Sequence, residues 1–189
     1  MNARSTRPFG VADAMILVAA TAVGFSILPT NWWGYLHPSG LRGWRAVAAA
    51  LPFGLRCLVG PWLAWTIAGG IIRLRSPRPP IRRLRNQPGI VAFGAAGITF
   101  VVAIPSYVIT HLRWPGPAQP WLVHPWLADS VGGLLHSVPL AVIAGWFTLW
   151  LGGRWRPEAS WIDRLGRFFG SGWIVFHVID AYWFETEWF

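Results

Sequence analysis

Long apolar runs separated by short polar segments dominate the chain. The runs cover about residues 11–28, 46–72, 89–109, 131–151 and, less apolar than the others, 168–184. Because a helix needs about 20 mostly apolar residues to cross the hydrocarbon core of a bilayer, the first four runs are long enough to span it. The fifth run contains His177 and Asp180, and it either spans thinly or lies in the interface. The pattern predicts an all-α fold, a polytopic transmembrane helical bundle of about four to five spans.

Two of these runs leave alternatives open. Pro52 and Pro61 interrupt the second run, but membrane helices tolerate proline where neighbours satisfy the freed carbonyls, so we expect one kinked helix. The first run contains Ala20-Thr21-Ala22, which resembles the small-residue cleavage site of a signal peptide. Asp13 is unusual in a signal peptide and favourable near a helix N-terminus, where the macrodipole favours an acid. We therefore favour a retained span over a cleaved leader.

The composition excludes several other classes of protein. Of 189 residues, 54% are hydrophobic and 12% are charged, whereas soluble domains carry roughly 25% charged residues. Disordered chains combine low hydrophobicity with high charge, and disulfide scaffolds need several cysteines, whereas this chain has only Cys57. We expect residues 1–189 to form a single integral membrane domain.

The positive charge is distributed as in the loops of a membrane protein. All sixteen basic residues are arginine. If the N-terminus is cytoplasmic, twelve of them fall in cytoplasmic segments, namely 1–10, 73–88 and 152–167. The opposite segments hold three, and Arg56 lies within the second run. This asymmetry predicts a cytoplasmic N-terminus in the bacterial inner membrane, and it argues against nucleic acid as the partner of the basic residues.

Arginine and tryptophan also indicate contacts with membrane lipids. Most of the fifteen tryptophans lie at the ends of the runs, where indole rings form an interfacial belt. The segment between the second and third runs offers six arginines to anionic lipid headgroups or to an acidic partner: Arg73, Arg75, Arg78, Arg82, Arg83 and Arg85. The alternative is that these arginines only determine the topology, around a stiff proline-rich middle.

Pairs of small residues four positions apart predict close contacts between helices. Such pairs let two helix backbones approach each other in a membrane. The chain has them at Ala20 and Gly24, at Ala92 and Ala96, and at Gly166 and Gly170. The pattern does not distinguish packing within the chain from packing against another subunit.

No sequence motif assigns a catalytic residue, a metal site or a specific cofactor. The chain has no Walker loop, no GxGxxG fingerprint, no HExxH and no CxxC. Polar side chains at membrane depth are then the candidate functional residues, because they are costly there. Five of them fall at similar depth in the expected outer half: Arg56, Tyr107, His136, His177 and Asp180.

This outer polar cluster has three interpretations. In the structural one, Arg56 pairs with Asp180, the histidines hydrogen-bond to neighbouring backbone, and the cluster, Tyr107 included, only stabilises contacts between helices. In the second, His136, His177 and Asp180 bind a metal or a haem-like ring, with Gly132 leaving room for a flat macrocycle. In the third, the cluster is a proton-linked or substrate site of a transporter or membrane enzyme.

One segment carries a resemblance to known sequences. The stretch Ala12-Asp-Ala-Met-Ile-Leu-Val-Ala-Ala-Thr-Ala-Val-Gly24 resembles the first membrane helix of uncharacterised bacterial multi-pass membrane proteins. The resemblance implies a membrane protein and no particular activity.

The sequence therefore favours a non-enzymatic role. We expect an integral membrane accessory or scaffold subunit that packs against other membrane chains. The alternative is a redox subunit that binds haem, pigment or metal, or a small transporter, using His136, His177 and Asp180.

Overall fold

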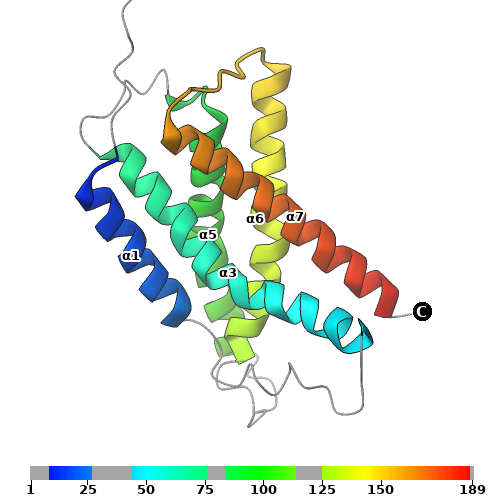
Figure 1. Ribbon diagram of the computed structural model, residues 1–189. Coiled ribbons are helices and arrows are strands. Elements are labelled where there is room, and N and C mark those ends of the chain that lie inside the picture. Colours follow the sequence, from blue (N-terminus) through cyan, green and yellow to red (C-terminus); the bar gives the residue numbers. More distant parts are fainter. Residues whose placement is uncertain (1–8, 27–43, 76–83, 114–124, 188–189) are drawn as a thin grey trace, which may run out of the picture.

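The computed structural model describes residues 9–26, 44–75, 84–113 and 125–187, and every element in these ranges is a helix. The helices are α1 (Val11–Ser26), α3 (Trp44–Leu74), α5 (Pro88–Arg113), α6 (Pro125–Leu151) and α7 (Trp161–Glu187) (Figure 1). The predicted all-α fold is therefore confirmed for the described residues. The described part of each of the five apolar runs lies within one helix.

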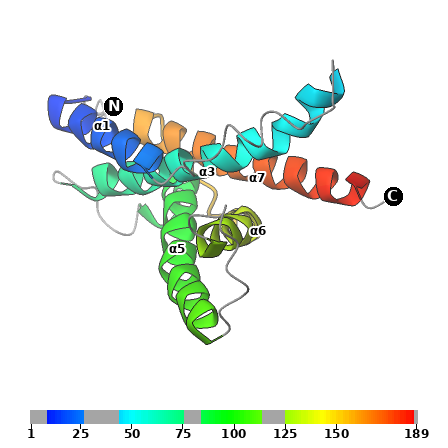
Figure 2. The ribbon, with the colours of Figure 1, turned by 90° about the horizontal axis from the view of Figure 1, so that it is seen from below.

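The prolines do not divide the second run. α3 continues for 31 residues through Pro52 and Pro61, as one helix. Figures 1 and 2 show that the helix bends along its length. A proline removes one helical hydrogen bond and kinks the helix without ending it. The expected single kinked helix is confirmed.

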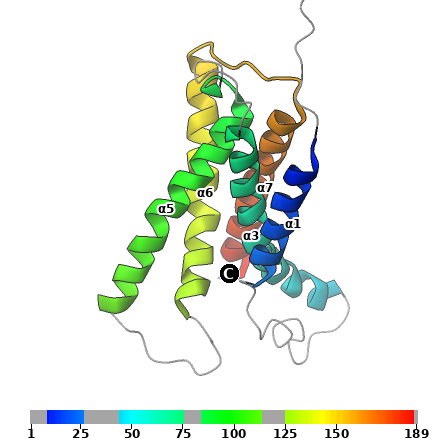
Figure 3. The ribbon, with the colours of Figure 1, turned by 90° about the vertical axis from the view of Figure 1, so that its left-hand side faces the viewer.

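Consecutive helices run in opposite directions, so their ends gather at two ends of the bundle (Figures 1 and 3). The end of α3, the start of α5, the end of α6 and the start of α7 lie together, and we call this the arginine end. Five exposed arginines lie in or next to these helix termini: Arg75, Arg85, Arg154, Arg156 and Arg164. The opposite end carries the starts of α3 and α6 and the ends of α5 and α7.

The helices form two groups around a shared core. α3 lies between α1 and α7, and α5 and α6 pack against this group (Figures 2 and 3). The core between α3, α5, α6 and α7 contains side chains with almost no exposed surface, including Val59, Ala92, Leu135, Val138 and Trp173. α5 leans away from α3 toward the opposite end (Figure 3).

The four tryptophans that lie away from the ends of the apolar runs tie pairs of helices together. Trp62 on α3 donates its indole N–H to the Phe169 carbonyl of α7 at 3.2 Å, and Trp65 on α3 donates to Thr21 Oγ1 of α1 at 2.8 Å. Trp146 on α6 donates to the carbonyl of Pro88, the first residue of α5, at 2.8 Å. Trp173 on α7 donates to Thr66 Oγ1 of α3 at 3.2 Å. Each ring thus buries apolar surface while its N–H finds a partner.

Two of the predicted small-residue pairs contribute close contacts within the chain. A Cβ added at Gly24 would lie 2.4 Å from Pro61 Cα of α3. A Cβ added at Gly166 would lie 2.5 Å from the Gly89 carbonyl oxygen, and one at Gly170 would lie 2.6 Å from the Trp146 ring. Only glycine allows these approaches. At these positions, small residues serve intramolecular packing.

By length and composition, two of the described helical segments are apolar enough to cross a membrane. They are Cys57–Leu74 on α3 and Gly133–Leu151 on α6. Val11–Ser26 and Pro88–Ala103 are apolar but shorter. Core helices of soluble proteins have the same properties, so the two segments establish candidate spans.

Candidate functional site

The structure brings two of the predicted polar residues into direct contact. His136 of α6 and His177 of α7 face each other, with 3.2 Å between their Nδ1 atoms. Their ring centroids are 5.1 Å apart and their planes meet at 89°. One ring donates an N–H hydrogen bond to the other, because a hydrogen bond between two imidazole nitrogens needs one N–H and one lone pair.

Equal depth on two neighbouring helices explains this contact. His136 follows the start of α6 at Pro125, and His177 precedes the end of α7 at Glu187. At about 1.5 Å per residue, each lies roughly 15 Å from the same end of the bundle. His136 is exposed and His177 is half-buried. The pair therefore lies at the edge of the core, next to the buried side chains of Leu135 and Phe176.

Of the other members of the outer polar cluster, the structure describes only the side chain of Asp180. Asp180 lies one turn beyond His177 on α7 and is 2% exposed. Among the described residues, no three His, Cys, Asp or Glu side chains are grouped so that they could hold a metal ion. The structure thus joins two of the three expected cofactor ligands. The side chains of Arg56 and Tyr107 lie outside the described residues, so the expected Arg56–Asp180 pair stays a prediction.

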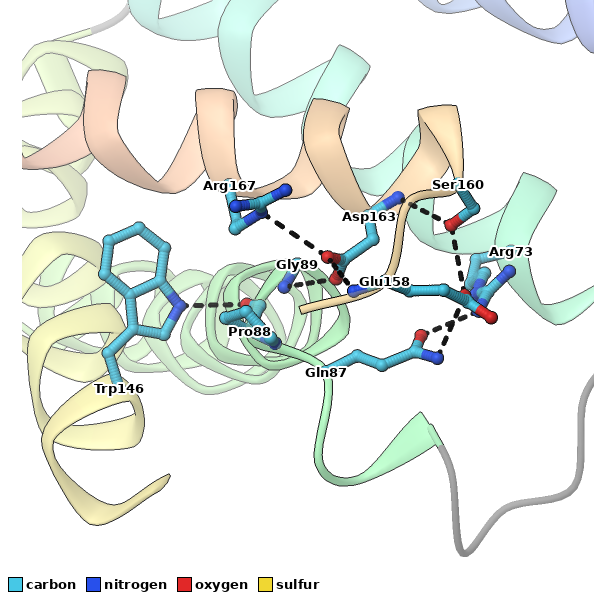
Figure 4. Close-up of polar contacts among 9 residues, drawn as sticks. All are labelled: Arg73, Gln87, Pro88, Gly89, Trp146, Glu158, Ser160, Asp163 and Arg167. Carbon is cyan, nitrogen blue, oxygen red and sulfur yellow. Dashed lines mark hydrogen bonds and ion pairs between the residues drawn. The ribbon is translucent and has the colours of Figure 1, made fainter. Parts of the chain in front are cut away.

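A second polar cluster, at the arginine end, was not predicted from the sequence (Figure 4). The buried Arg73 guanidinium at the end of α3 forms an ion pair with Glu158 and donates to Gln87 Oε1 at 2.7 Å. Gln87 Nε2 donates to Glu158 Oε2 at 3.0 Å, and Ser160 Oγ donates to the same oxygen at 3.1 Å. These four residues connect α3 with the segments that precede α5 and α7.

One carboxylate of this cluster caps α5 and also bonds to the segment that precedes α7. Asp163 Oδ1 accepts the backbone N–H of Gly89, in the first turn of α5, at 3.0 Å. Its Oδ2 accepts the backbone N–H of Glu158 at 3.0 Å and lies 3.4 Å from Arg167 Nε. Asp163 itself lies in the first turn of α7, where its own N–H donates to Ser160 Oγ at 3.4 Å. A negative charge is favourable at the N-terminus of both helices.

The contact at Gly89 depends on the absence of a side chain. A Cβ there would lie 2.5 Å from the Asp163 carbonyl oxygen. The glycine therefore lets the first turns of α5 and α7 touch, and Trp146 of α6 adds its bond to the Pro88 carbonyl at the same place (Figure 4). We call the group Arg73, Gln87, Gly89, Glu158, Ser160 and Asp163 the end clamp. Its donors and acceptors bond mainly to one another, as in a rigid structural unit.

The end clamp also changes the role expected for the basic segment. Arg73, one of the six arginines assigned to lipid headgroups, is 8% exposed and bonds to Glu158 and Gln87. Arg75 and Arg85 are exposed and remain available to headgroups. Arg78, Arg82 and Arg83 lie outside the described residues.

Part of the end clamp has a signal in the sequence. Ser160-Trp-Ile-Asp163 has the spacing of a capping box and marks the start of α7. The ion pair between Arg73 and Glu158 joins residues far apart in the chain, and no local sequence pattern predicts such a contact.

Comparison with known proteins found no matching family model, no matching curated protein and no matching solved structure. The functional argument therefore rests on the geometry of this chain.

Proposed function

We propose that the chain is an integral protein of the bacterial cytoplasmic membrane. All five helices cross this membrane, and the arginine end lies in the cytoplasm. In this membrane the chain serves as a non-enzymatic accessory or scaffold subunit that packs against other membrane chains.

The distribution of exposed apolar side chains supports a lipid environment. Large apolar side chains point outward on every described helix, for example Val18 (69% exposed), Leu58, Ile98 (69%), Phe147 and Val178. In water such continuous apolar exposure is unfavourable, whereas in lipid it costs nothing. The proposal thus accounts for the outward apolar surface.

The distribution of charge supports the orientation. Among the arginines whose side chains the structure describes, the exposed ones all lie at the arginine end: Arg75, Arg85, Arg154, Arg156 and Arg164. Cationic segments are retained on the cytoplasmic side during insertion, and there they meet the anionic headgroups of the inner leaflet. The end clamp would hold these segments in place at that surface.

The observation that carries the scaffold role is an open glycine face on α5. A Cβ added at Gly94 or at Gly97 would meet nothing within 4 Å. On the same face lie Ile98 and Val101, which are 69% and 68% exposed. Contact with lipid tails does not require glycine, whereas the close approach of a second helix does. Since Gly24, Gly166 and Gly170 are covered within the chain, this uncovered face is the one we assign to a partner helix.

The mass of the extracted particle tests this role. After gentle detergent extraction from native membranes, we expect a particle well above one 21.0 kDa chain plus its micelle, measured by light scattering after size exclusion. The double variant Gly94→Leu with Gly97→Leu should bring the mass down to that of a single chain while thermal unfolding of the chain itself stays unchanged.

A matched variant separates loss of the partner from a general effect of leucine. Gly54 on α3 also has open space around an added Cβ, and Gly54→Leu should leave the particle mass unchanged. A wild-type chain that is a folded monomer in mild detergent, or a Gly94/Gly97 variant of unaltered mass, would contradict the scaffold role.

A further inference from the structure

We propose that His136 and His177 form a binding site for a borderline transition-metal ion such as Zn²⁺ or Cu²⁺, held between α6 and α7. The site does not depend on the scaffold role.

The spacing of the two nitrogens fits such an ion. Zinc binds imidazole nitrogen at about 2.0–2.1 Å, so two ligands at a tetrahedral angle stand about 3.3 Å apart. The two Nδ1 atoms are 3.2 Å apart. The distance between the nitrogens thus matches that between two imidazole ligands of one ion.

The orientation and exposure of the rings leave the site open to an ion. The planes meet at 89°, so the rings approach edge to face and do not stack over the facing nitrogens. His136 is exposed, and His177 is half-buried, which restricts its ring. Metal binding requires both Nδ1 atoms to be unprotonated, with each proton on Nε2.

The donor set decides which class of ion binds. Neutral imidazole suits zinc, copper and nickel, whereas calcium and magnesium require oxygen ligands. Two protein ligands leave the remaining coordination positions to water or to an external ligand. Such an open sphere is typical of sites that exchange a ligand, in contrast to closed structural sites.

An ion at this position would also hold the second half of α7 against its neighbour. The end clamp holds the start of α7 against α5 through Asp163 and Gly89. The histidine pair lies toward the opposite end of the same helix. A bound ion would tie α7 to α6 there, so metal binding should stabilise the whole chain by an amount that rises with the logarithm of the metal concentration above the dissociation constant.

Metal titration of the full-length, chelator-stripped protein in detergent tests the site. We expect one Zn²⁺ per chain by calorimetry, and for Cu²⁺ an electron paramagnetic resonance spectrum with nitrogen couplings from two imidazoles. His136→Asn and His177→Asn should each weaken binding by about tenfold or more. A variant with the other three histidines, His37, His111 and His124, changed to Asn should bind as the wild type does.

Thermal unfolding with and without Zn²⁺ shows whether each variant is folded and whether the ion stabilises it. The ion should raise the unfolding midpoint of the wild type and of the control variant, and leave the midpoints of the two single variants unchanged. Equal binding by the single variants, or loss of binding in the control variant alone, would overturn the site and identify the metal as bound elsewhere.

Discussion

Two acidic side chains at the arginine end, Asp163 and Glu158, each accept hydrogen bonds from more than one segment of the chain. Asp163 accepts N–H groups from the first turn of α5 and from the segment before α7, so one carboxylate fixes the mutual position of both helices. Glu158 similarly accepts from Arg73, Gln87 and Ser160. Buried polar groups of this kind stabilise a structure only when all of them are paired.

Removing the acid of the Arg73–Glu158 pair should therefore be costly. Glu158→Leu leaves a buried guanidinium with one fewer partner, and we expect a loss of about 3 kcal/mol in the free energy of unfolding. Arg73→Leu combined with it should recover part of that loss. Thermal or denaturant unfolding in detergent measures both effects, with the exposed Arg154→Gln as a control that changes nothing. A silent Glu158→Leu would show that the pair contributes nothing to stability.

A similar double-mutant cycle tests the predicted pair at the opposite end. Asp180 is 2% exposed, so we expect Asp180→Ala to lower the free energy of unfolding, by about 3 kcal/mol if its partner is a buried arginine. Arg56→Leu in the same chain should restore part of the loss. Simple additivity of the two substitutions would mean that Arg56 and Asp180 do not meet.

At the residue level, the sequence predicted the similar depth of His136 and His177, because depth can be counted along the apolar runs. The cap of α7 was not predicted, although the spacing Ser160-x-x-Asp163 could have indicated it. Arg73 was assigned to lipid headgroups because its neighbours in the sequence are also arginines. Its partner Glu158 comes from another connection, and only the folded chain brings the two together.

Among the elements, apolar runs located the helices better than they located the helix ends. α3 and α5 begin and end within a few residues of the predicted runs, whereas α6 begins at Pro125 and α7 at Trp161, well before the expected 131 and 168. Both early turns are polar or charged at several positions, so hydropathy alone does not include them. Pro125 suits a first helical turn because its missing N–H has no helical partner to lose.

Contact between α5 and α7 depends on a pair of glycines, which a matched pair of alanines can test. In Gly166→Ala the new Cβ would lie 2.5 Å from the Gly89 carbonyl oxygen, and backbone on both sides has little room to move. We expect a loss of about 2 kcal/mol. Gly94→Ala, where the added Cβ meets nothing, should be neutral or stabilising by up to about 1 kcal/mol, because alanine favours helix.

Unfolding midpoints of the two alanine variants in the same detergent provide the comparison. Equal midpoints would contradict the close approach of α5 and α7 at Gly89. The sequence had indicated Gly166 as a contact residue, but Gly89 opposite it belongs to no small-residue pair that we had singled out.

For the whole molecule, the lengths of three helices fit the proposed membrane-spanning bundle. α5, α6 and α7 have 26, 27 and 27 residues, or about 40 Å each at 1.5 Å per residue. A hydrocarbon core is about 30 Å thick, and tilted helices accommodate the excess. In Figure 1, α3 and α7 run obliquely to α6.

Sidedness is the central claim, and cysteine labelling in intact cells tests it most directly. In a Cys57→Ser background, single cysteines replace Ser76 and Ala159, in the segments at the arginine end, and Gln119, in the segment between α5 and α6. Permeabilised cells provide the control that each cysteine can react. We predict that an impermeant maleimide added outside labels position 119 and leaves positions 76 and 159 unlabelled. Labelling of 76 and 159 but not 119 would invert the orientation, and labelling of none or all three in intact cells would contradict a chain that crosses the membrane between them.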